Sequence, residues 1–188
     1  MRKLLLLCSV LILTAGCTNT ANEGSKPSAS ESSYSADKWN STDEMFVQMM
    51  IPHHEQAVTM SGLALKNTDN QDLLKLASDI ASAQSLEITQ MQSWLRDWKS
   101  SPMSHMHMGD DGMLSPSEIQ QLKISLNHNF DQLFLSGMIR HHQGAVEIAK
   151  DELASGVNAN ARHLAESVVK TQNAEIKKML ALQTSVQD

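Results

Sequence analysis

The sequence predicts an all-α protein, a four-helix bundle made of two repeated helical hairpins. An internal repeat is the main indication: the segment from Met49 to Val58 returns as Gly137 to Val146, 88 positions later and without an insertion or deletion. Aromatic residues form only 4% of the chain while 12 residues are Met, so the core is aliphatic and rich in thioethers, which suits helices. One hairpin is too small to bury its own apolar face, so we expect the two to pack together.

The first sixteen residues are typical of an export signal. Arg2 and Lys3 precede the apolar run from Leu4 to Leu13, which is too short to span a bilayer as a helix. Small residues before Cys17 resemble the lipoprotein signal, in which this cysteine is lipidated and becomes the N-terminus. An ordinary secretory signal cleaved nearby is the alternative. Because Cys8 leaves with the signal, neither a disulfide nor a cysteine-based metal site is expected.

Residues 17–40 predict a flexible tether between the lipid and the helical domain. Their composition is mostly Ser, Thr, Asn, Glu, Gly and Pro, which buries too little apolar surface to offset the entropy of ordering. We therefore expect a protein held on a bacterial membrane and facing the extracytoplasmic side. The net charge of −6 offers no basic surface for nucleic acid, so DNA or RNA binding is not expected.

The helical domain is assigned to residues 41–188, and its first repeat to residues 43–94. Capping and acidic residues at 41–44 begin a helix that helical spacing extends to about residue 66. After a turn, an apolar stripe predicts a second long helix, in which Gln84 and Glu87 are the polar members. These two buried side chains need partners, because an unpaired buried charge is costly.

The two repeats are joined by residues 100–116, where Pro and Gly break the helical pattern. A short helix is expected near 117–126. The second repeat covers residues 131–182, with helices at about 130–154 and 158–184, and Gln172 and Glu175 interrupt its second stripe as Gln84 and Glu87 do the first.

The repeated motif identifies a family. Each M-I-x-H-H segment is followed about thirty residues later by Q-x-x-E-I-x-x-M, and this pair of motifs resembles the domain of unknown function 305 family over residues 43–182. The resemblance implies a ferritin-like helical bundle, usually exported, with several members associated with copper binding and copper resistance. It implies no particular reaction.

The motif also supplies the candidate metal ligands of the core. Imidazole with thioether suits Cu(I), whereas imidazole with carboxylate suits Zn(II), Cu(II) or Fe(II), so the available side chains favour copper without excluding other metals. We expect the two glutamates, with Gln84 and Gln172, mainly to orient the imidazoles. The alternative is a satisfied polar network that only fixes how the hairpins meet. The candidates are His53, His54, His141, His142, Met49, Met50, Met91, Met138, Met179, Glu87 and Glu175.

A second candidate site lies in the connection between the repeats. Alternating His and Met in a segment with Gly and Asp suit a soft metal better than a core position, although an incidental loop is the alternative. Its members are Met103, His105, Met106, His107 and Met108, with Met113 following. His128 and His163 have no counterparts in the repeat and are expected on the surface.

Three functions remain open at this point. The first is a cell-envelope protein that binds or buffers copper as Cu(I), Cu(II) or Ag(I) for tolerance or trafficking. The second is a metal-free structural or interaction bundle, and the third is a metal-dependent oxidase. Di-iron enzymes of this architecture need about four carboxylates and two Glu-x-x-His motifs, and this chain offers one core carboxylate per hairpin, so we expect no enzyme. A homo-oligomer and a copper-transfer partner stay open.

Overall fold

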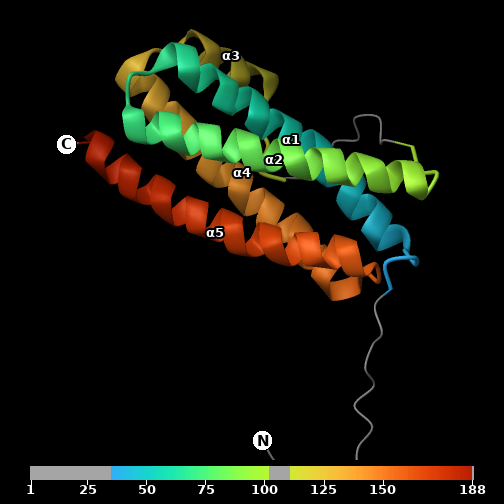
Figure 1. Cartoon of the computed structure of the whole chain (residues 1–188). Coiled ribbons are helices and arrows are strands. Elements are labelled where there is room, and N and C mark those ends of the chain that lie inside the picture. The colour runs from blue at the N-terminus through green and yellow to red at the C-terminus, as the bar shows by residue number, and fades with distance from the viewer. Residues whose placement is uncertain (1–34, 102–110, 188) are drawn as a thin grey trace, which may run out of the picture. The chain divides into compact units, whose positions relative to one another are not determined.

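The computed structural model describes residues 35–101 and 111–187, and in these ranges the protein is helical (Figure 1). The helices form two long antiparallel hairpins, α1 with α2 and α4 with α5, with the short α3 between them. This confirms the predicted all-α fold and the short extra helix. The elements are α1 (Ser41–Asn67), α2 (Gln71–Asp97), α3 (Pro116–Ile124), α4 (Asn127–Ser155) and α5 (Ala159–Gln187).

Side-chain caps determine where the helices begin. The Asn40 side chain accepts hydrogen bonds from Thr42 N and Asp43 N and so starts α1. The Asn70 side chain does the same for Leu73 N at α2. In repeat two, Asn158 Oδ1 accepts from Ala161 N at the start of α5. Asn70 and Asn158 are equivalent in the two repeats, so the duplication includes the caps.

A polar layer divides the core into two apolar clusters. α1 packs along α2 and α4, and α4 packs along α5, whereas α2 and α5 touch little. Towards one end lies a cluster that includes Phe46, Met50, Met91, Trp94, Ala145 and Leu164. Towards the other end lies a cluster that includes Ala57, Met60, Ile80, Phe134, Met138 and Met179. On every long helix the residues between the two clusters include buried His or Gln.

The hairpins are fastened to each other at their ends by carboxylates. Asp43 at the start of α1 accepts hydrogen bonds from Val157 N and Asn158 N, at 3.0 and 2.8 Å, and so binds the beginning of α5. Its counterpart Asp131 at the start of α4 accepts from Asn70 Nδ2 at 3.1 Å, at the beginning of α2. Each hairpin thus supplies an acceptor to the second helix of the other.

Next to Asp43, a second carboxyl group is buried without a counterpart in repeat one. Glu152 in α4 is fully buried, and position 64 of α1, its equivalent, is Ala. Burial, and then the neighbouring carboxylate of Asp43 with its negative charge, raise the pKa of Glu152 to about 8, against a smaller opposite effect of Arg162. Glu152 therefore carries a proton at neutral pH. A Cβ at Gly156 would overlap this carboxyl group, so a larger residue there would displace the Glu152 side chain.

Candidate metal centre

The repeated histidines meet in the polar layer at the middle of the bundle. His53 and His54 of α1 and His141 and His142 of α4 are all 0% exposed. The rings of His53 and His141 are 3.8 Å apart, centroid to centroid, at an angle of 40°. Neighbouring rings on the same helix are 6.5 Å apart in α1 and 6.3 Å apart in α4. The packing of α1 against α4 thus gathers four imidazoles from distant parts of the chain.

The outer two histidines are bound to the glutamates of the repeated motif. His54 Nε2 lies 2.7 Å from Glu87 Oε2, and His142 Nε2 lies 2.9 Å from Glu175 Oε2. An ionised carboxylate only accepts hydrogen bonds, so Nε2 carries a proton in both rings. Neither Nδ1 has a hydrogen-bond partner in the described structure. The glutamates therefore orient imidazoles, and each leaves a buried nitrogen free.

The inner two histidines differ from each other. His53 Nε2 donates a hydrogen bond to the backbone carbonyl of Asp111 at 3.0 Å, and its Nδ1 has no partner. His141 has no partner on either ring nitrogen within the described residues. Burial lowers the pKa of His53 to about 3, and burial with the nearby histidines lowers the pKa of His141 well below its usual value. Both rings are therefore neutral at pH 7, the form in which imidazole binds metals.

The two glutamines do not make the contacts that we predicted. Gln84 and Gln172 are buried in the layer, but Gln84 Nε2, Gln84 Oε1 and Gln172 Oε1 have no hydrogen-bond partner among the described residues. The glutamates one turn further along α2 and α5 accept from the outer imidazoles. The unpaired amides instead add to the polar atoms that a bound ion could recruit.

Thioethers lie beside the histidines on both hairpins. Met50 and Met138 each precede an outer histidine by one helical turn and are fully buried, as are Met91 and Met179. Met49 is half-buried. Nowhere in residues 35–101 and 111–187 do three His, Cys, Asp or Glu side chains converge as a ready-made metal site. The layer thus offers nitrogen and sulfur donors, and rotation of these side chains would have to bring them onto one ion.

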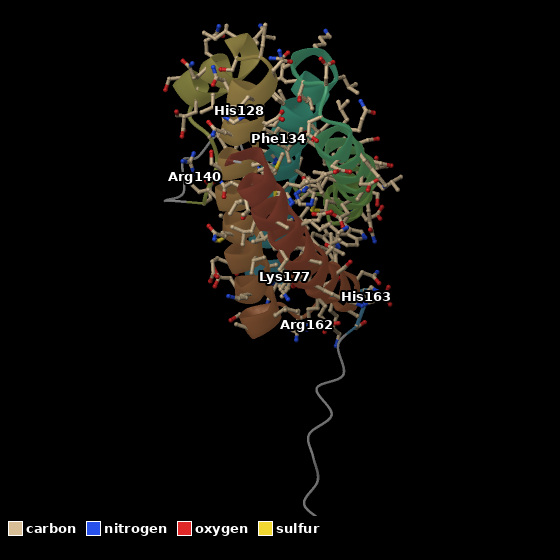
Figure 2. The ribbon with its side chains drawn as sticks, turned by 90° about the vertical axis from the view of Figure 1, so that its left-hand side faces the viewer. His128, Phe134, Arg140, Arg162, His163 and Lys177 are labelled. Atoms are coloured by element: carbon tan, nitrogen blue, oxygen red, sulfur yellow. The ribbon has the colours of Figure 1, made fainter. Side chains whose placement is uncertain are left out.

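The remaining candidates are distributed as follows. His128 and His163 are exposed near opposite ends of the bundle, which confirms their predicted surface position (Figure 2). Met113 is half-buried at the beginning of the chain that leads into α3. The segment Met103–Met108 and Cys17 lie outside the described residues. In the part of the chain that the structure describes, no helix has the length and apolarity needed to cross a membrane.

The family follows from the comparison of the whole chain. The model of the family called domain of unknown function (DUF305) matches residues 43–183, which include both His-His motifs and both glutamates. The chain belongs to the DUF305 family. This confirms the resemblance read from the repeated motifs.

Solved DUF305 structures and their relatives share the fold. A DUF305 protein from Streptomyces coelicolor, described as secreted, is 31% identical with a TM-score of 0.75, over 81% of this chain and 95% of its own. CopM in its Cu(I)-bound form is 31% identical with a TM-score of 0.65, over 76% of this chain and 96% of its own. CopM has also been solved with Cu(II) and with Ag bound.

A curated relative covers a smaller part of the chain. The uncharacterized protein L153 of Acanthamoeba polyphaga mimivirus is 39% identical over 57 residues, which is 30% of this DUF305 chain. The matched part amounts to 38% of the length of the viral protein. This match therefore adds nothing on activity.

One contact of the site was missed from the sequence. Asp111 reaches His53 through its backbone carbonyl, so its side-chain chemistry gave no indication. A signal was nevertheless present, because Gln56 of repeat one is replaced by Gly144 in repeat two, two residues after the paired histidines. A glycine inside a helix often marks the close approach of another backbone.

The carboxylate–imidazole pairs give a first prediction. Glu87→Gln and Glu175→Gln should each weaken copper affinity about tenfold to a hundredfold, because the amide no longer fixes the imidazole as the carboxylate does. Copper titration of the two single variants and of the double variant measures this effect. Because the pairs are equivalent in the two repeats, the single variants serve as matched controls for each other. Wild-type affinity in the double variant would show that the carboxylates play no part in binding.

Proposed function

We propose that this protein binds copper in the polar layer of its helical bundle, as a copper-buffering or copper-trafficking protein of the cell envelope. The observation that carries the proposal is the set of four fully buried imidazoles, whose Nδ1 atoms have no hydrogen-bond partner among the described residues. Buried polar atoms without partners are rare in folded proteins and call for an explanation. A bound ion would supply the missing partner.

The chemistry of the surrounding side chains favours Cu(I). Imidazoles with thioethers one turn away are the nitrogen and sulfur donors that a soft ion prefers. Cu(II) would draw more on Glu87 and Glu175, which lie next to the outer histidines. The CopM structures with Cu(I), Cu(II) and Ag bound support the same range of ions for a relative of this fold.

Export and membrane attachment are part of the proposal. The basic and apolar start of the chain supports export, as does the description of the Streptomyces protein as secreted. Lipidation of Cys17 would then hold the bundle at a membrane, on its extracytoplasmic side. We further propose that Met103–Met108 binds Cu(I) or Ag(I) as a second site, because it combines thioethers and imidazoles.

Metal-dependent melting tests the core site. Anaerobic addition of Cu(I) should raise the melting temperature of the wild type, since a ligand at a hundred times its Kd stabilises the folded state by about 2.7 kcal/mol. His53→Ala and His141→Ala should lose this gain. His128→Ala and His163→Ala, which change exposed histidines, are the matched controls and should keep it.

The same experiment separates binding from a purely structural role. If the histidines only fix how the hairpins meet, His53→Ala should destabilise the metal-free bundle by about 1 to 3 kcal/mol, and Cu(I) should change neither protein. A wild type that gains no stability from Cu(I), Cu(II) or Ag(I) would therefore rule out the core site.

A further inference from the structure

A short backbone segment lies across α1 and α4 directly beside the inner histidines. Residues 111–114, which we call the strap, contact α1 at two points. The carbonyl of Asp111 accepts the hydrogen bond from His53 Nε2. One turn further along α1, the Gln56 side chain donates to Leu114 O at 2.9 Å and accepts from Leu114 N at 2.6 Å. The second contact resembles a backbone pairing and fixes the position of the strap along the helix.

On the α4 side the strap fits against a glycine. A Cβ at Gly144 would overlap the carbonyl oxygen of Asp111, and a Cβ at Gly112 would overlap the carbonyl of Arg140. Gly112 also has a φ of 78°, which disfavours other residues. The Leu114 side chain is buried near Met60 and Gly137. The strap can therefore reach His53 only because two backbones approach where both side chains are absent.

Among the described residues, the outer histidines make the same contacts in both repeats. The inner histidines differ, because only His53 contacts the strap. Gln56 and Gly144 are equivalent positions, and one binds the strap by its side chain while the other makes room for it. His141 is the counterpart of His53 and has no partner on either nitrogen among the described residues. The strap thus breaks the symmetry of the inner pair, since it constrains one ring and leaves the other unconstrained.

We propose that the strap is a positioning element that holds His53 as its Nε2–H tautomer and so makes Nδ1 the nitrogen that binds copper. The inference rests on the proposed function. A carbonyl oxygen can only accept a hydrogen bond, so it selects this tautomer and fixes the ring plane. His141 can offer either nitrogen, which lets it adjust to the ion while His53 stays fixed.

Displacement of the strap tests the proposal. In Gly144→Ala the new methyl group should push Asp111 away, so that metal-free His53 becomes a mixture of tautomers in ¹⁵N-histidine NMR spectra. Gly62→Ala is the matched control, because it also places alanine in a long helix but its Cβ would meet nothing within 4 Å. The control should leave the His53 tautomer unchanged.

A second variant reaches the strap from the opposite side. Gln56→Ala removes both hydrogen bonds to Leu114 without changing α4, and it should speed amide exchange at Leu114 and mix the His53 tautomers. Both strap variants should bind Cu(I) about tenfold to a hundredfold more weakly than the full-length wild type, as expected when a hydrogen bond that orients a ligand is lost.

The outcomes separate this inference from the proposed function. Strap variants that keep a single Nε2–H tautomer at His53, or that keep wild-type Cu(I) affinity, would overturn the positioning role. A wild type that binds no Cu(I) would refute the proposed function and the copper part of this inference. The tautomer comparison is made on metal-free protein, and it would still decide whether the strap holds His53.

Discussion

Replacing Glu152 with glutamine is expected to make the bundle more stable at pH 8 and to remove the loss of stability that ionisation of Glu152 causes above pH 4.5. In the folded protein the pKa of Glu152 is raised from 4.5 to about 8, so between these values the unfolded chain has lost the proton and the folded chain retains it. The contribution of Glu152 to stability therefore falls as the pH rises through this window, and it is largest below pH 4.5. Each pKa unit corresponds to about 1.4 kcal/mol, so the loss is on the order of 3 to 5 kcal/mol.

The glutamine variant isolates this effect because it has the shape of the protonated acid and does not titrate. Urea unfolding at pH 4.5, 6 and 8 should show nearly equal stability at the lowest pH and a growing advantage of Glu152→Gln above it. Glu147→Gln is the control, since Glu147 is an exposed residue of the same helix, paired with Lys150. It should change stability by less than about 1 kcal/mol at every pH. Parallel curves for wild type and Glu152→Gln would contradict the raised pKa.

Asp43→Asn should be among the most destabilising single changes at the ends of the bundle. The Asp43 carboxylate accepts hydrogen bonds from the backbone N–H groups of Asn40, Val157 and Asn158. In the asparagine variant an NH2 group replaces one carboxylate oxygen. This group must face at least one of these N–H donors and cannot accept a hydrogen bond from it. Hydrogen bonds to a charged acceptor are worth about 1.5 to 3 kcal/mol each, so a loss of about 2 to 4 kcal/mol is expected.

The internal repeat supplies the control for this change. Asp131 occupies the equivalent position, but one of its oxygens accepts from Asn70 Nδ2 and the other has no partner in the described structure. Asp131→Asn can keep that single contact and should cost less than about 1 kcal/mol. The free energy of unfolding of both variants is measured at pH 5. Glu152 stays protonated in the folded state at this pH, so ionisation of Glu152 does not affect the comparison. Equal losses at the two positions would mean that the acceptor role of Asp43 is unimportant.

Much of the fold could be predicted because its determinants are local or repeated. The apolar stripes depend on spacing along one helix, as does the start of α1, where the N-cap is Asn40, next to the predicted capping residues 41–44. The constant offset between the repeats then predicts that the paired histidines of both hairpins meet. The contacts of Glu87 and Glu175 with the outer histidines agree with the orienting role expected from the motif.

Other features depend on contacts that no local pattern reveals. The strap joins His53 to a backbone carbonyl 58 positions away, and the pairing of Glu152 with Asp43 depends on how α4 ends beside α1. The buried glutamines illustrate the opposite case, because their spacing placed them correctly in the layer but could not show which atoms their amides would contact. Whether Met103–Met108 binds soft ions stays a prediction.

The carboxylate contacts that Asp43 and Asp131 make between the hairpins affect the order in which the protein folds. The partners of Asp43 lie 114 and 115 positions further along the chain. Each hairpin, in contrast, forms through contacts between helices that are neighbours in the sequence. Distant contacts form late, because closing a long loop costs entropy before any contact compensates for it. We therefore expect the hairpins to form early with frayed starts of α2 and α5, and the carboxylate contacts to close last. A single repeat produced alone would lack the carboxylate acceptor that the other repeat supplies. Each half of the duplication therefore depends on the other half to order the start of its second helix.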